Sequence, residues 1–147
     1  MSPLALIPNA EALVGKWLRE HAEIQALDAR VAGRTPDTLT LPWVRVTLIA
    51  ATENFTIGRE LMHTHFLQLD CYAGKSATDS LNGQSEAWTL KATARAVLKA
   101  IEGTAPDGVA VSSVVFNGDS RIPDTTMEPA RERYILSVEV MMRALSA

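Results

Sequence analysis

The segment from Met62 to Glu102 constrains the fold most, because its hydrophobic period changes from that of a strand to that of a helix. From Met62 to Tyr72, apolar and polar residues alternate, which is typical of a strand with one buried face. A turn is expected at Ala73 to Ser76, followed by a polar crossing. From Ala87 to Ile101, alanines and aliphatic residues recur at helical spacing. This order predicts a long strand, a crossing and an alanine-rich helix.

The rest of the chain supplies one further helix and three further strands. Asn9 is placed to accept a backbone N–H bond as the N-cap of a helix whose buried face runs to His21. His21 would then interact with the negative end of the helix dipole. Residues 24–31 are expected to form another short turn. The remaining alternating segments are Trp43 to Ala50, Val109 to Phe116 and Tyr134 to Met142.

The order helix, strand, strand, helix, strand, strand predicts an α+β fold. We expect one domain spanning residues 1–147, with two helices packed on one face of a mainly antiparallel sheet of four to five strands. The connection from Thr52 to Leu61 is predicted to be an exposed hairpin arm. The connection from Asn117 to Arg133 is predicted to be a long polar loop, partly mobile until a partner contacts it. Three cations of the second helix are expected to face solvent: Lys91, Arg95 and Lys99.

Composition and charge argue against several classes of protein. The 147-residue chain has a formal net charge of −3, whereas domains that grip phosphate backbones usually carry a basic excess. Cys71 is the only cysteine, so packing rather than an intramolecular disulfide must hold the fold, which suits a reducing compartment. No stretch approaches the ~20 apolar residues of a membrane span, and the run from Leu4 to Ile7 is too short for the core of a signal peptide. The sequence therefore predicts no membrane span and no evident export signal.

Some residue groups could carry chemistry. The Gly-Lys-Ser triplet at 74–76 has the ending of a phosphate-binding loop, but Leu69 stands where that motif needs a glycine, so an exposed turn is predicted. His63 and His65 share one side of a strand. Two imidazoles without a third ligand favour a polar strand end at a subunit seam over a metal site. Cys71 is aligned with apolar residues and is predicted to be a core thiol.

The long polar connection carries mixed charge. Its carboxylates, which could be read as general acids and bases, are Asp119, Asp124, Glu128 and Glu132, and the interleaved arginines are Arg121, Arg131 and Arg133. Mixed charge in a mobile loop favours a solvated or interface segment, because catalysis needs rigidly placed groups. The sequence also lacks the GxSxG, HExxH and GxGxxG motifs. We therefore predict no catalytic residue, no cofactor and no metal, and hence no enzyme.

Four segments follow one another in a distinctive order and spacing. They are Leu41-Pro42-Trp43-Val44-Arg45-Val46, Phe66-Leu67-Gln68-Leu69-Asp70-Cys71-Tyr72-Ala73, an alanine-rich helix ending at Leu98 to Gly103, and Tyr134-Ile135-Leu136-Ser137-Val138. In this order they resemble the tail terminator (tail completion) proteins of long-tailed bacteriophages, from the first helix to the last strand. The resemblance implies a small α+β subunit that assembles into a ring, usually of six. Such a ring caps the finished tail tube, stops its polymerisation and presents the surface that joins the head.

The resemblance also implies partners and a location. The partners would be further copies in a homohexameric ring, the tail tube protein and the head–tail connector or neck protein. Viral DNA would pass through a neutral or acidic lumen without specific binding. The ring would sit at the head-proximal end of the virion tail, after assembly in the cytoplasm of the bacterial host. Two alternatives stay open: a neighbouring neck protein of similar size, and a small metal- or ligand-binding α+β enzyme.

Subunit contacts can be assigned to particular segments. So small a domain has little reason to build a strand as long as Met62 to Tyr72 unless part of it extends beyond its own core. We therefore expect this strand and the arm from Thr52 to Leu61 to contribute to the subunit seam. Four charged residues are predicted to contact a neighbouring subunit or the tail tube: Arg59, Glu60, Arg121 and Asp124.

Overall fold

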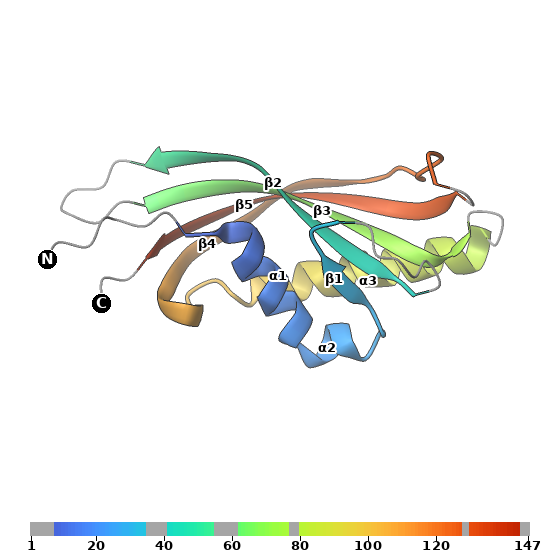
Figure 1. Ribbon diagram of the computed structural model, residues 1–147, viewed down its shortest axis with the longest axis horizontal. Coiled ribbons are helices and arrows are strands. Elements are labelled where there is room, and N and C mark those ends of the chain that lie inside the picture. Colours follow the sequence, from blue (N-terminus) through green and yellow to red (C-terminus); the bar gives the residue numbers. More distant parts are fainter. Residues whose placement is uncertain (1–7, 35–40, 55–61, 77–79, 128–129, 145–147) are drawn as a thin grey trace, which may run out of the picture.

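The helices and the sheet form two layers, with the helices on one face of the sheet (Figure 1). The computed structural model describes residues 8–34, 41–54, 62–76, 80–127 and 130–144. The elements in chain order are α1 (Ala10–Glu20), α2 (Ala22–Gln25), β1 (Arg30–Ala32), β2 (Trp43–Asn54), β3 (Met62–Ser76), α3 (Ser80–Lys99), the 3₁₀ turn η2 (Pro106–Gly108), β4 (Val109–Arg121) and β5 (Arg131–Ala144).

The strands form one sheet in the order β1-β2-β3-β5-β4. β1 is parallel to β2, and every other neighbouring pair is antiparallel. The predicted α+β fold, with its helices on one face, is therefore confirmed, and the sheet is mixed. No described helix is long and apolar enough to cross a membrane.

β1 is an edge strand where the sequence predicted only a turn. Its three residues pair with the first three residues of β2. Val31 in this strand is buried, and Arg19 of α1 donates from Nη1 to its carbonyl oxygen at 3.5 Å. Three residues are too few to display an alternating pattern, so the sequence alone cannot distinguish this strand from a turn.

β3 is the central strand, and it is longer than predicted. The turn expected at Ala73 to Ser76 is wrong, because β3 continues through these residues to pair with Arg131 of β5 after a shift in register. Within the shift, the Gly74 N–H donates to Glu86 Oε1 of α3 at 2.6 Å. Glu86 thus satisfies a donor that the irregular ladder leaves free, and it occupies an amide that a phosphate would need. α3 begins at Ser80, earlier than its apolar stripe predicted.

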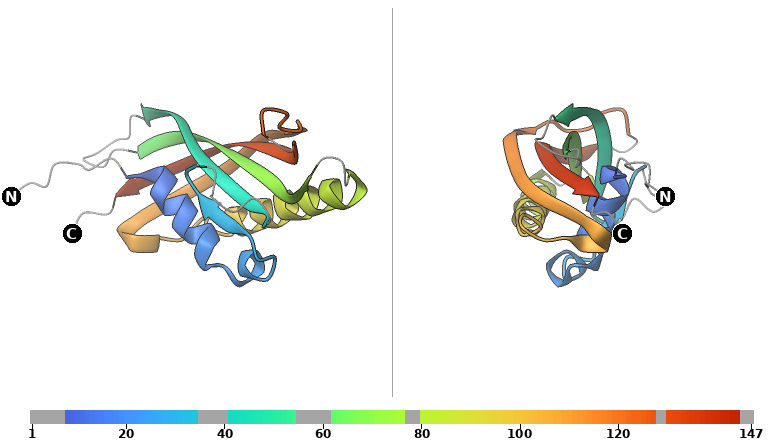
Figure 2. Two further views of the ribbon diagram at one scale, coloured as in Figure 1. Left: turned by 45° about the vertical axis from the view of Figure 1, so that its right-hand side comes forward. Right: turned by 90° about the vertical axis from the view of Figure 1, so that its left-hand side faces the viewer.

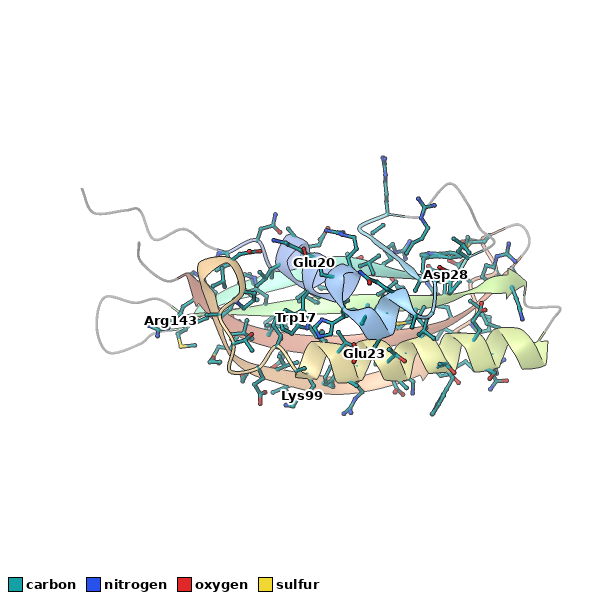
Figure 3. All side chains as sticks on the ribbon, turned by 90° about the horizontal axis from the view of Figure 1, so that it is seen from below. Trp17, Glu20, Glu23, Asp28, Lys99 and Arg143 are labelled. Carbon is teal, nitrogen blue, oxygen red and sulfur yellow. The ribbon has the colours of Figure 1, made fainter. Side chains whose placement is uncertain are left out.

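α1 begins and ends as predicted. Asn9 is its N-cap, and Asn9 Oδ1 accepts from the Ala12 N–H at 3.0 Å. His21 is its C-cap, and its ring Nδ1 lies 3.1 Å from the carbonyl oxygen of Trp17 in the last turn. Trp17 lies between α1 and α3 (Figure 3), where its Nε1 donates to the Val97 carbonyl oxygen at 2.8 Å. This bond ties the two longer helices together.

The core fills the space between the helices and the sheet. Its largest fully buried aliphatic side chains are Leu18, Ile24, Leu67, Leu69, Leu90, Leu98, Ile101, Leu136 and Met142. Burying each of them contributes about 1.5–3 kcal/mol to folding. Cys71 belongs to the same cluster, so the predicted core thiol is confirmed. Burial, with a smaller contribution from the Asp70 carboxylate, raises the pKa of this thiol and makes it unreactive.

β4 and β5 form a longer hairpin than predicted. The loop expected from Asn117 to Arg133 is wrong for most of its length, because β4 continues to Arg121 and β5 begins at Arg131. Polar residues occupy both faces of these strand ends, so no alternation reveals them. Asp124 even forms an isolated bridge with Arg131 beyond the strands. Figure 2 shows this hairpin at the opposite end of the molecule from the first turn of α1.

Candidate assembly surfaces

Three cations on α3 run along β4 at intervals of four residues, which places them on one side of the helix. The contacts of this cation row are Lys91 Nζ to Asp119 Oδ2 at 3.0 Å, Arg95 Cζ to the Phe116 ring centroid at 4.7 Å, and Lys99 Nζ to the Val114 carbonyl oxygen at 2.8 Å. The prediction that these cations face solvent is wrong for Lys91, whose side chain is 13% exposed. The other two are exposed but contact β4 as well. The cation row therefore holds α3 beside the edge strand.

The outer edge of β4 is closed over its first half. Val111 exchanges two backbone hydrogen bonds, of 2.8 and 2.9 Å, with residues 103–104. At Val114 two side chains replace a neighbouring strand, because the Val114 N–H donates to Glu102 Oε2 at 2.8 Å while Lys99 binds the carbonyl oxygen. The bond from Val114 and the ion pair with Lys99 lower the pKa of the Glu102 carboxyl. An edge satisfied in this way is protected from pairing with another chain.

The outer edge of β2 is closed in a similar way. β1 covers its first three residues, and Glu11 of α1 then accepts from the Leu48 N–H through Oε2 at 2.9 Å. Ile49 follows at a register shift and is 60% exposed. Beyond it, residues 50–54 pair with β3, and no described residue pairs with their other edge. We call these five residues the β2 open end.

β4 has a matching open end. Residues 118–121 pair with β5 on one side, after a register shift at Asn117, and on the other side no residue in the described ranges pairs with their backbone. Trp88 of α3 lies close by, because Lys91 Nζ, bound to Asp119 of this segment, is 5.3 Å from the centre of the Trp88 ring. The Trp88 side chain is 53% exposed. Among the residues that the structure describes, each edge of the sheet is thus closed over one stretch and open over another.

The predicted contact residues have the following positions. Arg121 binds Glu132 through two bonds, of 3.1 Å from Nε and 2.8 Å from Nη2. Asp124 accepts from Thr126 and, at 3.2 Å, from the Tyr72 hydroxyl. The Thr126 hydroxyl is the main cause that lowers the pKa of the Asp124 carboxyl. Both side chains therefore have partners within the subunit, and Arg59 and Glu60 lie outside the described residues.

The mixed charges of the predicted loop are organised rather than loosely solvated. Asp119 and Arg121 belong to β4, whereas Arg131, Glu132 and Arg133 belong to β5. Besides the pairs already given, Arg133 Nη1 lies 3.8 Å from Asp124 Oδ2. Glu128 lies outside the described residues. The loop interpretation failed because pairing partners in a hairpin depend on its register, which charge order alone does not define.

The face of the sheet away from the helices buries a carboxylate. Asp70 alternates with core residues of β3 and so points away from them, yet it is 0% exposed. Arg45 donates to Asp70 Oδ2 from Nε at 3.2 Å and from Nη2 at 3.0 Å, and Gln68 donates to Oδ1 at 3.0 Å. Beside this group the rings of Trp43 and Tyr72 stack with centroids 4.5 Å apart. Long side chains lying along the sheet cover their neighbours here.

His63 and His65 lie on the opposite, helix-facing side of β3, with ring centroids 6.2 Å apart. They are 5% and 1% exposed, so this end of the strand is buried, and its expected place at a subunit seam stays a prediction. Nδ1 of both rings and Nε2 of His65 have no hydrogen-bond partner within the described ranges. Burial, and secondarily His63, lowers the pKa of His65. The part of the chain that the structure describes contains no group of three His, Cys, Asp or Glu side chains that could hold a metal.

The model of a family described as tail completion protein gp17 matches residues 12–143, from α1 to the end of β5. The chain belongs to this family. The resemblance found in the sequence is therefore confirmed, and the chain is a structural protein of a bacteriophage tail. A comparison with curated proteins finds no match.

A tail completion protein interacts with other components of the tail. Exposed large apolar side chains are the surface groups that gain most free energy when a partner covers them. In the described residues these are Leu41, Leu48, Ile49, Trp88, Val115 and Ile122. Ile49 and Trp88 are the two most exposed, and each lies next to an open end of the sheet. The open ends are therefore the best candidates for assembly contacts.

Proposed function

We propose that the chain is the subunit of a six-membered ring that caps the finished tail tube, ends its polymerisation and presents the surface to which the head joins. The observation that carries this proposal is the family match along residues 12–143. The shape of the subunit supports it, because the strands reach past the first turn of α1 (Figure 1). Part of the sheet thus extends beyond the helices that pack on it, and neighbouring subunits can contact this part.

In this proposal residues 1–147 act as one domain at the head-proximal end of the tail, assembled in the host cytoplasm. The partners are other copies, the tail tube protein and the head–tail connector. β3 and the arm at residues 52–61, with Arg59 and Glu60, contribute to the subunit seam. Arg121 and Asp124 contact a neighbour or the tube from the other end. The formal net charge of −3 supports a lumen through which viral DNA passes without specific binding.

The ring is tested by native mass spectrometry and negative-stain imaging of the purified protein. We expect a closed ring of six subunits, and we expect its addition to polymerising tail tube protein to stop growth. A protein that stays monomeric at high concentration, with or without tail tube, would contradict the proposal. Tight, salt-sensitive binding of duplex DNA would contradict the proposed lumen.

The alternative role, a neighbouring neck protein, predicts a different defect in infected cells that lack the chain. Loss of a terminator should give tails of uncontrolled length. Loss of a neck protein should give tails of normal length that fail to join heads. Tail-length distributions from electron micrographs distinguish the two outcomes.

A further inference from the structure

The two open ends lie at opposite corners of the sheet. The β2 open end pairs with the start of β3, whose other neighbour is the end of β5. The β4 open end pairs with the first half of β5, next to the far end of β3. They therefore differ both in the edge and in the end of the sheet that they occupy. A contact between them can form only between two molecules.

The closed stretches leave few other places for strand pairing. Along β2, β1 and Glu11 occupy the edge before Ile49. Along β4, the turn at residues 103–104 and the side chains of Lys99 and Glu102 occupy the edge around Val111 and Val114. Since each closed stretch already satisfies its backbone groups, an incoming strand gains nothing there. The two open ends are five and four residues long, so they can pair with each other along most of their length.

Side chains beside the open ends also complement each other. Ala50, Ala51 and Thr52 are small and exposed, which permits close approach of another backbone. Ile49 is an exposed aliphatic residue at the start of this segment, and Trp88 is an exposed aromatic residue beside the other open end. Burial of an aromatic side chain at the centre of a contact is the usual source of its strength.

We propose that the β2 open end of one subunit adds as a strand to the β4 open end of its neighbour, with Ile49 packed near Trp88. The proposal rests on the proposed ring and names the contact that builds it. Because two different surfaces meet, each subunit keeps one free site of each kind, and the chain of contacts ends only when it closes into a ring. A contact between two identical edges would instead stop at a dimer.

Disulfide trapping tests this pairing in the full chain, because Cys71 is buried and does not react. Thr52 and Ser120 are exposed and face away from the helices, as does Ala50. We expect Thr52→Cys/Ser120→Cys or Ala50→Cys/Ser120→Cys to form a ladder of covalent oligomers up to the ring under mild oxidation. Each single variant alone should stay uncoupled, and a mixture of two complementary single variants should stop at covalent dimers.

A matched control uses the closed stretch of β4. Thr52→Cys/Ser112→Cys places the second thiol on an exposed residue of the same strand, and it should give no ladder.

In a separate variant, Trp88→Ala should weaken ring assembly by at least about tenfold without unfolding the subunit. If native mass spectrometry finds the ring but neither Ser120 pair forms a ladder, the strand pairing is wrong while the ring stands. If only monomer is found, the ring itself is wrong. Covalent dimers from Thr52→Cys alone would show an isologous contact and would also overturn the pairing.

Discussion

Strand β3 buries polar side chains on both of its faces, but it pairs them differently. On the face away from the helices, the fully buried Asp70 carboxylate has hydrogen bonds from Arg45 and Gln68. On the helix-facing side, His63 and His65 are buried with three ring nitrogens unpartnered among the described residues. The comparison separates two effects of burial. The free energy of burying a charge depends on its partner. Burying an unpaired imidazole lowers the stability of the fold, but by an amount that the fold tolerates.

The strongest test of this difference removes the cation from the paired face. Arg45→Met should lower the free energy of unfolding by about 3 kcal/mol, because it leaves the Asp70 carboxylate buried without its counter-charge. Urea denaturation followed by circular dichroism measures the change. The double variant Arg45→Met/Asp70→Asn should recover most of the loss. Losses that simply add would show that the two side chains are not coupled.

A smaller effect is expected at the neighbouring phenol. Tyr72→Phe removes the hydroxyl that donates to Asp124 but keeps the stack on Trp43, so it should cost about 1 kcal/mol. Tyr134→Phe is the matched control, since Lys91 contacts the ring of Tyr134 rather than its hydroxyl, and its stability should be unchanged. Equal losses in the two variants would remove the special role assigned to the Tyr72 hydroxyl.

On the unpaired face, the prediction concerns pH. The pKa of His65 is lowered in the folded state, so the unfolded chain binds more protons once pH falls below about 6.5. Stability should therefore fall between pH 6.5 and 5, above the range in which most carboxylates titrate. His65→Leu should flatten this slope and leave stability at pH 7.5 unchanged or higher, because no hydrogen bond is lost. The measurement is the denaturation midpoint as a function of pH. If its slope between pH 6.5 and 5 is the same in His65→Leu as in the unaltered protein, another group causes the pH dependence.

The smallest effect is expected at the edge of the sheet, where the Glu102 carboxylate accepts the backbone N–H bond of Val114 in place of a neighbouring strand. Glu102→Gln weakens the acceptor for the Val114 N–H without removing it. Global stability should hardly change, but hydrogen exchange at the Val114 amide should become faster. Glu23→Gln on α2 is the control, and it should leave that amide unchanged. Slow exchange in both variants would show that the edge is closed by something other than the carboxylate.

The elements that the sequence predicted have patterns that depend on residues close together in the chain and that continue over many residues. The Asn9 cap and the alanine-rich helix follow from spacing within a few turns, and β3 follows from alternation. The sequence did not predict β1, which is too short for a period, or the strand ends around Arg121, which carry polar residues on both faces.

The contacts of the candidate assembly surfaces were harder to predict, because they join residues far apart in sequence. The cation row is visible as a repeat of four residues, yet its partner becomes clear only when β4 lies alongside α3. The pairing of Arg45 with Asp70 likewise depends on the register of β2 against β3. Exposure of Trp88 could not be read from its position in an amphipathic helix.

The diagonal placement of the two open ends has a consequence for the channel of the proposed ring. If neighbours join through opposite corners, the strands cannot run parallel to the axis of the assembly and must be inclined to it, as in closed β-barrels. The channel diameter then depends on how far β2 slides along its neighbour. Because a slip of one residue turns every side chain to the other face, only steps of two residues preserve the packing. The bore would therefore take one of a few discrete widths, and the inclination of the strands in an image of the assembly would report which one.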